Sequence, residues 1–280
     1  MAATTDSIRK SRQLVIRASR TSLSFSTATT ENEVTYHPYA IKNSISLTAN
    51  LREAMQSEPL LADDYTSVLV LVDSPVLMVP TEFFQEQDME TLFHHAFPSG
   101  QPLSQPGQDK STSHVVMHTV LPDLECVAVF SVHKDLRTVL SDRFGKVSFT
   151  PTPAPVWRHF HQRSFTGPRA KLYAYFHDRR MEVFNFSQNR FRFCNSFAAN
   201  NTPDALYYLL AVWKQLSLVP EHDELYLAGE LPDGEQLKTE AQRFLKRVYL
   251  INPAGEFNRA AITQIKGMPY DLMTLFVKGR

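Results

Sequence analysis

The sequence predicts an α/β protein built from two similar halves, with a smaller α+β unit inserted into the first half. Residues 171–198 have the pattern of three short strands joined by two tight turns, and residues 13–41 repeat it. The matching pairs are Leu14 with Leu172, Leu23 with Met181 and Phe25 with Val183, all at a shift of 158. A helix pattern and an apolar strand follow each stretch, so the chain is predicted to be a duplication.

Alternation of apolar and charged residues defines the strands of the second stretch. The apolar members are Met181, Val183, Phe191 and Phe193, and the charged members are Glu182, Arg190 and Arg192. Because side chains alternate across a strand, the two sets are expected on opposite faces. We therefore predict that only one face of this sheet is covered by a core.

A helix is predicted after each three-strand stretch. In the second half Thr202 can cap a helix in which Leu209 and Trp213 belong to an apolar stripe with spacings of three and four. Each helix leads to an apolar run, residues 67–72 in the first half and 224–228 in the second. Such runs are typical of a central strand covered on both faces.

The domain boundary is predicted near residue 155, which gives a first half over residues 1–155 and a second over 156–280. The first half contains an extra unit over about residues 76–132 that has no counterpart in the second half. It is predicted to hold a helix from Thr81 to about His95, followed by a β-hairpin.

Composition excludes several classes of function. Lys plus Arg equal Asp plus Glu at 29 each, so no bulk positive charge favours nucleic acid or an anionic membrane. The first residues lack the apolar segment of a signal peptide, and the longest apolar stretch, residues 68–80, contains Asp73 and Ser74. It is also shorter than the roughly 20 residues of a membrane-spanning helix. We expect a cytoplasmic protein that does not insert into the membrane.

Three kinds of catalytic or binding site are disfavoured by residue spacing. Adjacent His94 and His95 point apart on a helix, and no cluster completes a metal site, so no metal is predicted. Arg190 and Arg192 alternate with aromatic residues, whereas a nucleic-acid platform needs both on one face. No Gly-x-Ser-x-Gly motif supports a serine hydrolase.

The order of elements resembles the actin-like ATPase superfold, a ribonuclease H-like duplication with two mixed five-stranded sheets flanked by helices. The inserted unit resembles the extra subdomain of the pilus-assembly protein PilM and of the cytoplasmic part of the type II secretion L protein. The segments that carry this are VLVLVDSPVLMVPTEFF, FHHAFP and ECVAVFSVHKDLRTVLSDRFG. The segments LVDSPVLMVP and MPYDLMTLF are similar to an uncharacterised bacterial protein family with an actin-like ATPase fold.

This resemblance implies a nucleotide in the cleft between the halves, held by glycine-rich hairpin turns and by a metal on nearby carboxylates. The chain departs from that pattern. No glycine precedes Gly100, so the first turn, residues 18–22, lacks one. The second turn, residues 176–180, lies in a stretch without glycine from residue 168 to 228. Gly229, just after a central strand, matches the glycines that contact adenosine in the family, although a turn there favours glycine in any case.

The actin-like order of elements and the missing glycines together leave two main hypotheses for the function. The first is a non-catalytic interaction scaffold with no cofactor. It would bind an unidentified protein partner and could also form a homodimer. The second is an ATP-binding protein with weak or no hydrolysis, whose cleft residues would be Arg20, Asp178, Arg179 and Gly229. A nucleic-acid-associated factor is a third class, which the neutral charge disfavours. No catalytic residue is assigned, and we favour the scaffold.

Overall fold

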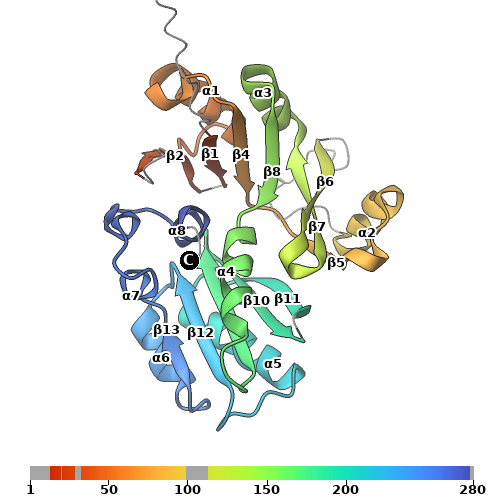
Figure 1. Ribbon diagram of the computed structural model, residues 1–280, viewed down its shortest axis with the longest axis vertical. Helices are drawn as coiled ribbons and strands as arrows, with labels where there is room; N and C mark the ends of the chain where they lie inside the picture. The colour runs from red at the N-terminus through yellow and green to blue at the C-terminus, as the bar shows by residue number, and fades with distance from the viewer. Residues whose placement is uncertain (1–12, 20, 29–32, 99–112, 189, 278–280) are drawn as a thin grey trace, which may run out of the picture.

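The structure is a computed structural model that describes residues 13–19, 21–28, 33–98, 113–188 and 190–277. Two mixed five-stranded sheets lie one above the other in Figure 1, with helix α8 (Tyr270–Phe276) between them and helix α4 (Ala154–Ser164) in front of the second sheet. Helices α1 (Leu47–Ser57) and α3 (Lys134–Phe144) pack against the first sheet, and α5 (Thr202–Gln215) and α6 (Gly234–Ala241) against the second. The predicted α/β class with two five-stranded sheets is confirmed.

Both sheets have the same strand order, with three antiparallel strands followed by two parallel ones. The first sheet has the order β3-β2-β1-β4-β8, from β1 (Gln13–Ala18), β2 (Leu23–Ala28), β3 (Val34–Tyr39), β4 (Ser67–Val72) and β8 (Val147–Pro151). The second has the order β11-β10-β9-β12-β13, from β9 (Lys171–His177), β10 (Arg180–Ser187), β11 (Arg190–Ala198), β12 (Glu224–Gly229) and β13 (Val248–Leu250).

The first hairpin of each sheet has the same register. Leu14 pairs with Thr27 in the first sheet, and Leu172 pairs with Asn185 in the second. All four positions obey the shift of 158 that aligns the two sequence stretches. The strand-for-strand repeat predicted from the sequence is therefore present in the backbone pairing.

Both faces of the second sheet are buried, so the prediction of a single covered face was wrong. Helix α4 contributes Trp157 to the cluster on one face, and α5 contributes Trp213 to the cluster on the other. A β-bulge beside residues 185 and 186 interrupts the alternation of β11. As a result Phe191 packs with the first cluster and Phe193 with the second, instead of sharing a face.

Helix α5 begins one residue earlier than predicted and uses a different cap. The side chain of Asn201, one residue before Thr202, accepts a hydrogen bond from the Asp204 backbone N–H. Leu209 and Trp213 are buried against the second sheet, as their spacing indicated.

The inserted unit is a three-stranded sheet of order β5-β7-β6 with helix α2 (Met89–Ala96). Its strands are β5 (Leu77–Pro80), β6 (His114–Leu121) and β7 (Cys126–His133). The predicted helix from Thr81 begins later than expected. Two 3₁₀ turns, Thr81–Phe83 and Glu86–Asp88, precede α2 because Phe84 and Gln85 between them are extended.

Ion pairs connect the inserted unit to the second half. Arg190 of β11 pairs with Glu82 and Glu125, each at 2.7 Å. Arg158 of α4 pairs with Asp123, in the 3₁₀ turn Pro122–Leu124. The unit is inserted in the first half but is held against the second.

The remaining elements are α7 (Pro253–Glu256) and the 3₁₀ turns Pro59–Leu61 and Ala261–Gln264. The boundary at residue 155 stays a prediction, and α4 runs across that position. Within the described ranges, every helix is too short or too polar to cross a bilayer.

Candidate functional site

The tips of two equivalent hairpins meet between the halves. Residues 19–22 connect β1 to β2, and Asp178 and Arg179 connect β9 to β10. Asp178 and Arg179 have φ angles of 45° and 62°, the left-handed conformations of a type I′ turn that usually contains Asn or Asp followed by Gly. Aspartate adopts this conformation readily, whereas arginine does so at a cost. The second hairpin therefore carries backbone strain at its tip.

The carboxylate of Asp178 is bound by four side chains of the first half. Its Oδ1 accepts hydrogen bonds from the hydroxyls of Ser19 at 2.6 Å, Thr21 at 2.7 Å and Ser22 at 3.1 Å. Its Oδ2 lies 2.7 Å from Nη2 of Arg17, and both side chains are at least 94% buried. We call these five residues the hairpin latch, because they join the two tips directly.

Backbone N–H groups of the first turn form hydrogen bonds within the turn itself. The Ser19 N–H donates to the Ser22 carbonyl at 2.8 Å, and the N–H groups of Thr21 and Ser22 donate to Ser19 Oγ at 3.2 and 2.9 Å. Arg17 Nη1 donates to Ser22 Oγ. In a phosphate-binding turn such N–H groups point at the ligand. Here the three described ones are already used inside the turn.

Asp271 of α8 extends the latch into both sheets. Arg17 Nε donates to its two carboxylate oxygens at 3.1 and 2.9 Å, and the Tyr175 hydroxyl of β9 donates to Oδ2 at 2.6 Å. The Arg17 and Asp271 side chains are 3% and 0% exposed. Arg17 therefore holds one carboxylate from the opposite hairpin and another from the helix between the sheets.

The charges of the latch stabilise one another. Burial disfavours the Asp178 carboxylate, but hydrogen bonds and charges from His177 and Arg17 outweigh it and hold its pKa well below the ordinary value. His177 Nδ1 lies 3.3 Å from Asp178 Oδ2, and Nε2 lies 3.6 Å from Glu182 Oε1. Burial opposes the imidazolium, yet the contact with Asp178 and the nearby charges of Glu182 and Asp73 raise the pKa of His177 to about 9.

Of the four cleft residues predicted from the sequence, the structure brings one into a network between the halves. Asp178 is the central acceptor of the latch, whereas Arg179 is exposed at the tip. Arg20 lies outside the described residues. Gly229 packs against β9, where an added Cβ would lie 2.1 Å from the Phe176 carbonyl oxygen. A nucleotide contact by any of them stays a prediction.

Asp271, which binds Arg17 of the latch, is a residue that sequence reasoning missed. It lies in the segment MPYDLMTLF, where one acidic residue interrupts an apolar helix and is fully buried. A charged residue on an apolar helix is a signal for a buried partner. Among the described residues, we found no group of three or more His, Cys, Asp or Glu side chains arranged to hold a metal ion.

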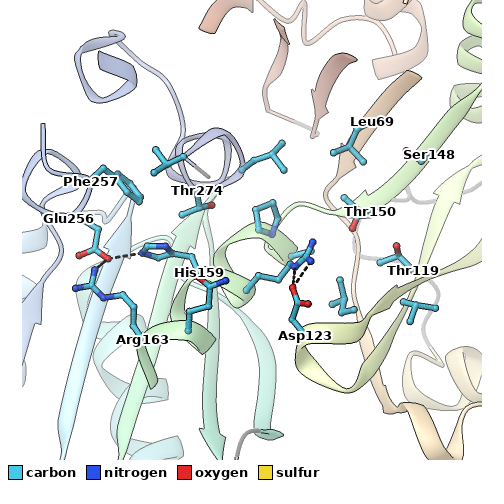
Figure 2. A pocket seen from close by; sticks show the side chains of 18 of the residues that line it. Leu69, Thr119, Asp123, Ser148, Thr150, His159, Arg163, Glu256, Phe257 and Thr274 are labelled. Carbon is cyan, nitrogen blue, oxygen red and sulfur yellow. Dashed lines mark hydrogen bonds and ion pairs between the residues drawn. The ribbon is translucent and has the colours of Figure 1, made fainter. Parts of the chain in front are cut away.

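A second feature is an open groove of about 990 Å³ along α4. Figure 2 shows it running from Glu256 and Phe257 on one side, past α4, to Thr119 and Thr150 on the other. Its walls come from α4, α8, the end of α7 and the segment after it, the 3₁₀ turn Pro122–Leu124, and strands β4, β6 and β8. The groove therefore lies where both halves and the inserted unit meet.

Ion pairs inside the groove compensate its charges. The Arg158 Nε and Nη2 atoms both donate to Asp123 Oδ2, at 2.9 and 2.5 Å (Figure 2). Glu256 accepts from Arg163 and lies 2.7 Å from His159 Nε2. Burial and the Arg163 charge lower the pKa of His159 to about 4, so its ring is neutral at pH 7. No sequence motif marks these residues, which come from three separate regions of the chain.

Comparison with protein families gives one match. The profile described as "Protein of unknown function (DUF3822)" matches residues 3–248. A search of curated proteins found no match.

Several solved structures are similar to this chain. A Bacteroides thetaiotaomicron VPI-5482 protein with an actin-like ATPase fold and unknown function is 28% identical, with a TM-score of 0.82 over 99% of this chain and 100% of that one. PilM in the PilM–PilN type IV pilus biogenesis complex is 13% identical, with a TM-score of 0.52 over 95% and 97%. The cytoplasmic domain of EpsL from Vibrio cholerae is 16% identical, with a TM-score of 0.43 over 92% and 96%. The actin-like ATPase fold expected from the sequence is confirmed.

Proposed function

The chain belongs to the DUF3822 family, and we propose that it is a non-catalytic protein of the actin-like ATPase fold that acts as a cytoplasmic scaffold for a protein partner. The observation that carries this proposal is the hairpin latch. A carboxylate of the second half is bound by the hydroxyls and the arginine of the first, at the position where the fold would hold phosphates.

The latch opposes nucleotide binding in two ways. The Asp178 carboxylate occupies the donors that a phosphate oxygen would need, and a triphosphate would be repelled by its charge. The N–H groups of Ser19, Thr21 and Ser22 are used within the turn. In-line phosphoryl transfer depends on a metal-bound, positioned triphosphate, so hydrolysis is not expected.

A scaffold needs fixed geometry and an accessible surface. The latch, the Arg158–Asp123 pair and the Arg190 pairs to Glu82 and Glu125 hold the halves and the inserted unit together. The groove along α4 offers an accessible surface. The PilM structure, which shares the fold, is that of a complex with PilN. Binding another protein is therefore within the capacity of this architecture.

The test has two arms. In the first, thermal unfolding of the purified protein is measured with and without Mg-ATP, together with phosphate release. Ligand at 100 times its dissociation constant would stabilise the protein by about 2.7 kcal/mol. We expect no stabilisation and no turnover. Turnover that disappears in Asp178→Ala or Gly229→Ala would overturn the proposal in favour of an ATPase.

The second arm tests the scaffold itself. The tagged protein is purified from its own host, and each co-purifying protein is produced separately and titrated against the pure chain. We expect a saturable one-to-one complex. A chain that binds none of the co-purified proteins directly would contradict the scaffold.

A further inference from the structure

We infer that the groove along α4 docks an uncharged, extended segment of the partner protein. This inference rests on the proposed function and specifies the partner's chemistry. Three features of the groove carry it: two strand edges that meet there, an exposed valine, and charges that are neutralised within its own walls.

The two strand edges belong to different sheets. Among the described strands, β8 is the last of the first sheet and β6 is the last of the inserted sheet. Residues 119–121 of β6 and 148–150 of β8 line the groove. The outer edge of a sheet presents backbone N–H and C=O groups that can pair with an added strand. An extended segment can use such an edge, and its affinity then comes from main-chain hydrogen bonds.

The exposed valine supplies an apolar contact beside that edge. Val120 of β6 is 49% exposed and lines the groove. β-Branched and aliphatic side chains of an added strand pack well against such a residue. The segment is therefore expected to carry an aliphatic residue opposite Val120.

The charges decide which segments fit. Arg158 is neutralised by Asp123, and Arg163 by Glu256, all four within the groove. A charged peptide would have to break one of these pairs or lose its water without gaining a partner. An uncharged segment avoids both costs, so charge complementarity favours a neutral occupant.

The experiment uses the full chain and a phage-displayed library of random linear dodecapeptides as the probe. Peptides selected on the wild-type protein are expected to be poor in Asp, Glu, Lys and Arg and to contain aliphatic residues. Val120→Glu places a charge in the groove and should weaken their binding by about tenfold or more. Val219→Glu is the matched control, because Val219 is also a valine that is 49% exposed but does not line the groove. It should bind like the wild type.

A variant that removes the partner of Arg158 tests whether the ion pairs of the groove exclude charged peptides. Asp123→Ala leaves Arg158 unpaired in the groove, so selection on this variant should shift toward peptides with Asp or Glu. Hydrogen exchange of the wild-type complex should show slower exchange of amides in β6 and β8.

The outcomes are decisive in both directions. Charged peptides selected on the wild type, equal binding by the two glutamate variants, an empty selection, or unchanged exchange in β6 and β8 would overturn the inference. Mg-ATP binding in the separate thermal assay would instead refute the proposed function. A partner protein that binds Val120→Glu as tightly as the wild type would overturn this inference but not the proposed function, because the partner would then bind another surface of the scaffold.

Discussion

Removing the Asp178 carboxylate should destabilise the protein more than its position in a surface turn suggests. In Asp178→Ala, Arg17 loses an ion pair at 2.7 Å in which both side chains are almost fully buried. Three hydroxyls, those of Ser19, Thr21 and Ser22, lose their acceptor at the same time. The variant thus removes one partner of a buried pair, which is the costly kind of change.

The expected magnitude is about 3 kcal/mol. Breaking a buried ion pair by deleting one partner typically costs about 3 to 5 kcal/mol. Arg17 keeps its second carboxylate, since Asp271 remains 2.9 Å away, so the charge is not left unpaired and the lower end applies. Asp123→Ala is the matched control. Its pair with Arg158 is about half exposed, with side chains at 49% and 48%, and should be worth about 1 kcal/mol or less.

The stability of both variants is measured by urea unfolding, followed by circular dichroism. The change in free energy of unfolding is calculated from the shift in the urea midpoint, provided that the dependence on urea concentration has the same slope as in the wild type. A double-mutant cycle of Asp178→Ala with Thr21→Val then isolates one contact of the latch, for which we expect a coupling energy of about 1 kcal/mol. Equal losses in Asp178→Ala and Asp123→Ala, with a coupling energy near zero, would show that the latch does not hold the halves together.

Other parts of the fold give further predictions. The pKa of His177 rises from 6.5 to about 9 on folding, so its contribution is fully present below pH 6.5 and is lost as pH rises through 9. At about 1.36 kcal/mol per pKa unit, the free energy of unfolding should fall by about 3 kcal/mol over that window in urea titrations, and His177→Gln should flatten the fall. Gly229→Ala should cost about 2 to 4 kcal/mol by chemical unfolding because its φ is +91° and the new Cβ meets a backbone carbonyl, whereas Gly145→Ala, at +69° in open space, should cost about 1 kcal/mol. Equal costs would remove the packing explanation. Trp213→Ala should cost about 3 to 5 kcal/mol, whereas replacing the exposed Arg190 by Ala should leave the free energy of unfolding nearly unchanged in the same assay. The reverse order would mean that the faces of the second sheet are misassigned.

The duplication could be predicted because each half repeats the same local pattern. A shift of 158 aligned Leu14 with Leu172, and the strand partners of these two residues, Thr27 and Asn185, differ by the same shift. What failed was the face assignment on β11, because a bulge changes which residues point to which side. A bulge depends on one unpaired residue in the ladder, and alternation in the sequence does not reveal it.

The candidate site was less accessible to sequence reasoning. The absence of glycine from both turns shows that they depart from the phosphate-binding pattern, but a missing motif says nothing of what replaces it. The replacement depends on contacts between residues more than 150 positions apart, such as Ser19 with Asp178 and Arg17 with Asp271. The groove along α4 combines four separate segments, and none of them carries a motif that marks the others.

The position of α8 has a consequence for the order in which the chain acquires structure during synthesis. β1 emerges from the ribosome early, yet Arg17 on it bonds to Asp271, 254 residues later. Val15 and Leu71 of the first sheet share a buried cluster with Leu272 and Met273 of α8. Until α8 has been translated, this face of the first sheet lacks its cover and Arg17 lacks the carboxylate it binds there. This face of the first sheet therefore reaches its native packing only after nearly all of the second half has been made, whereas the opposite face packs against a core that the first half supplies alone.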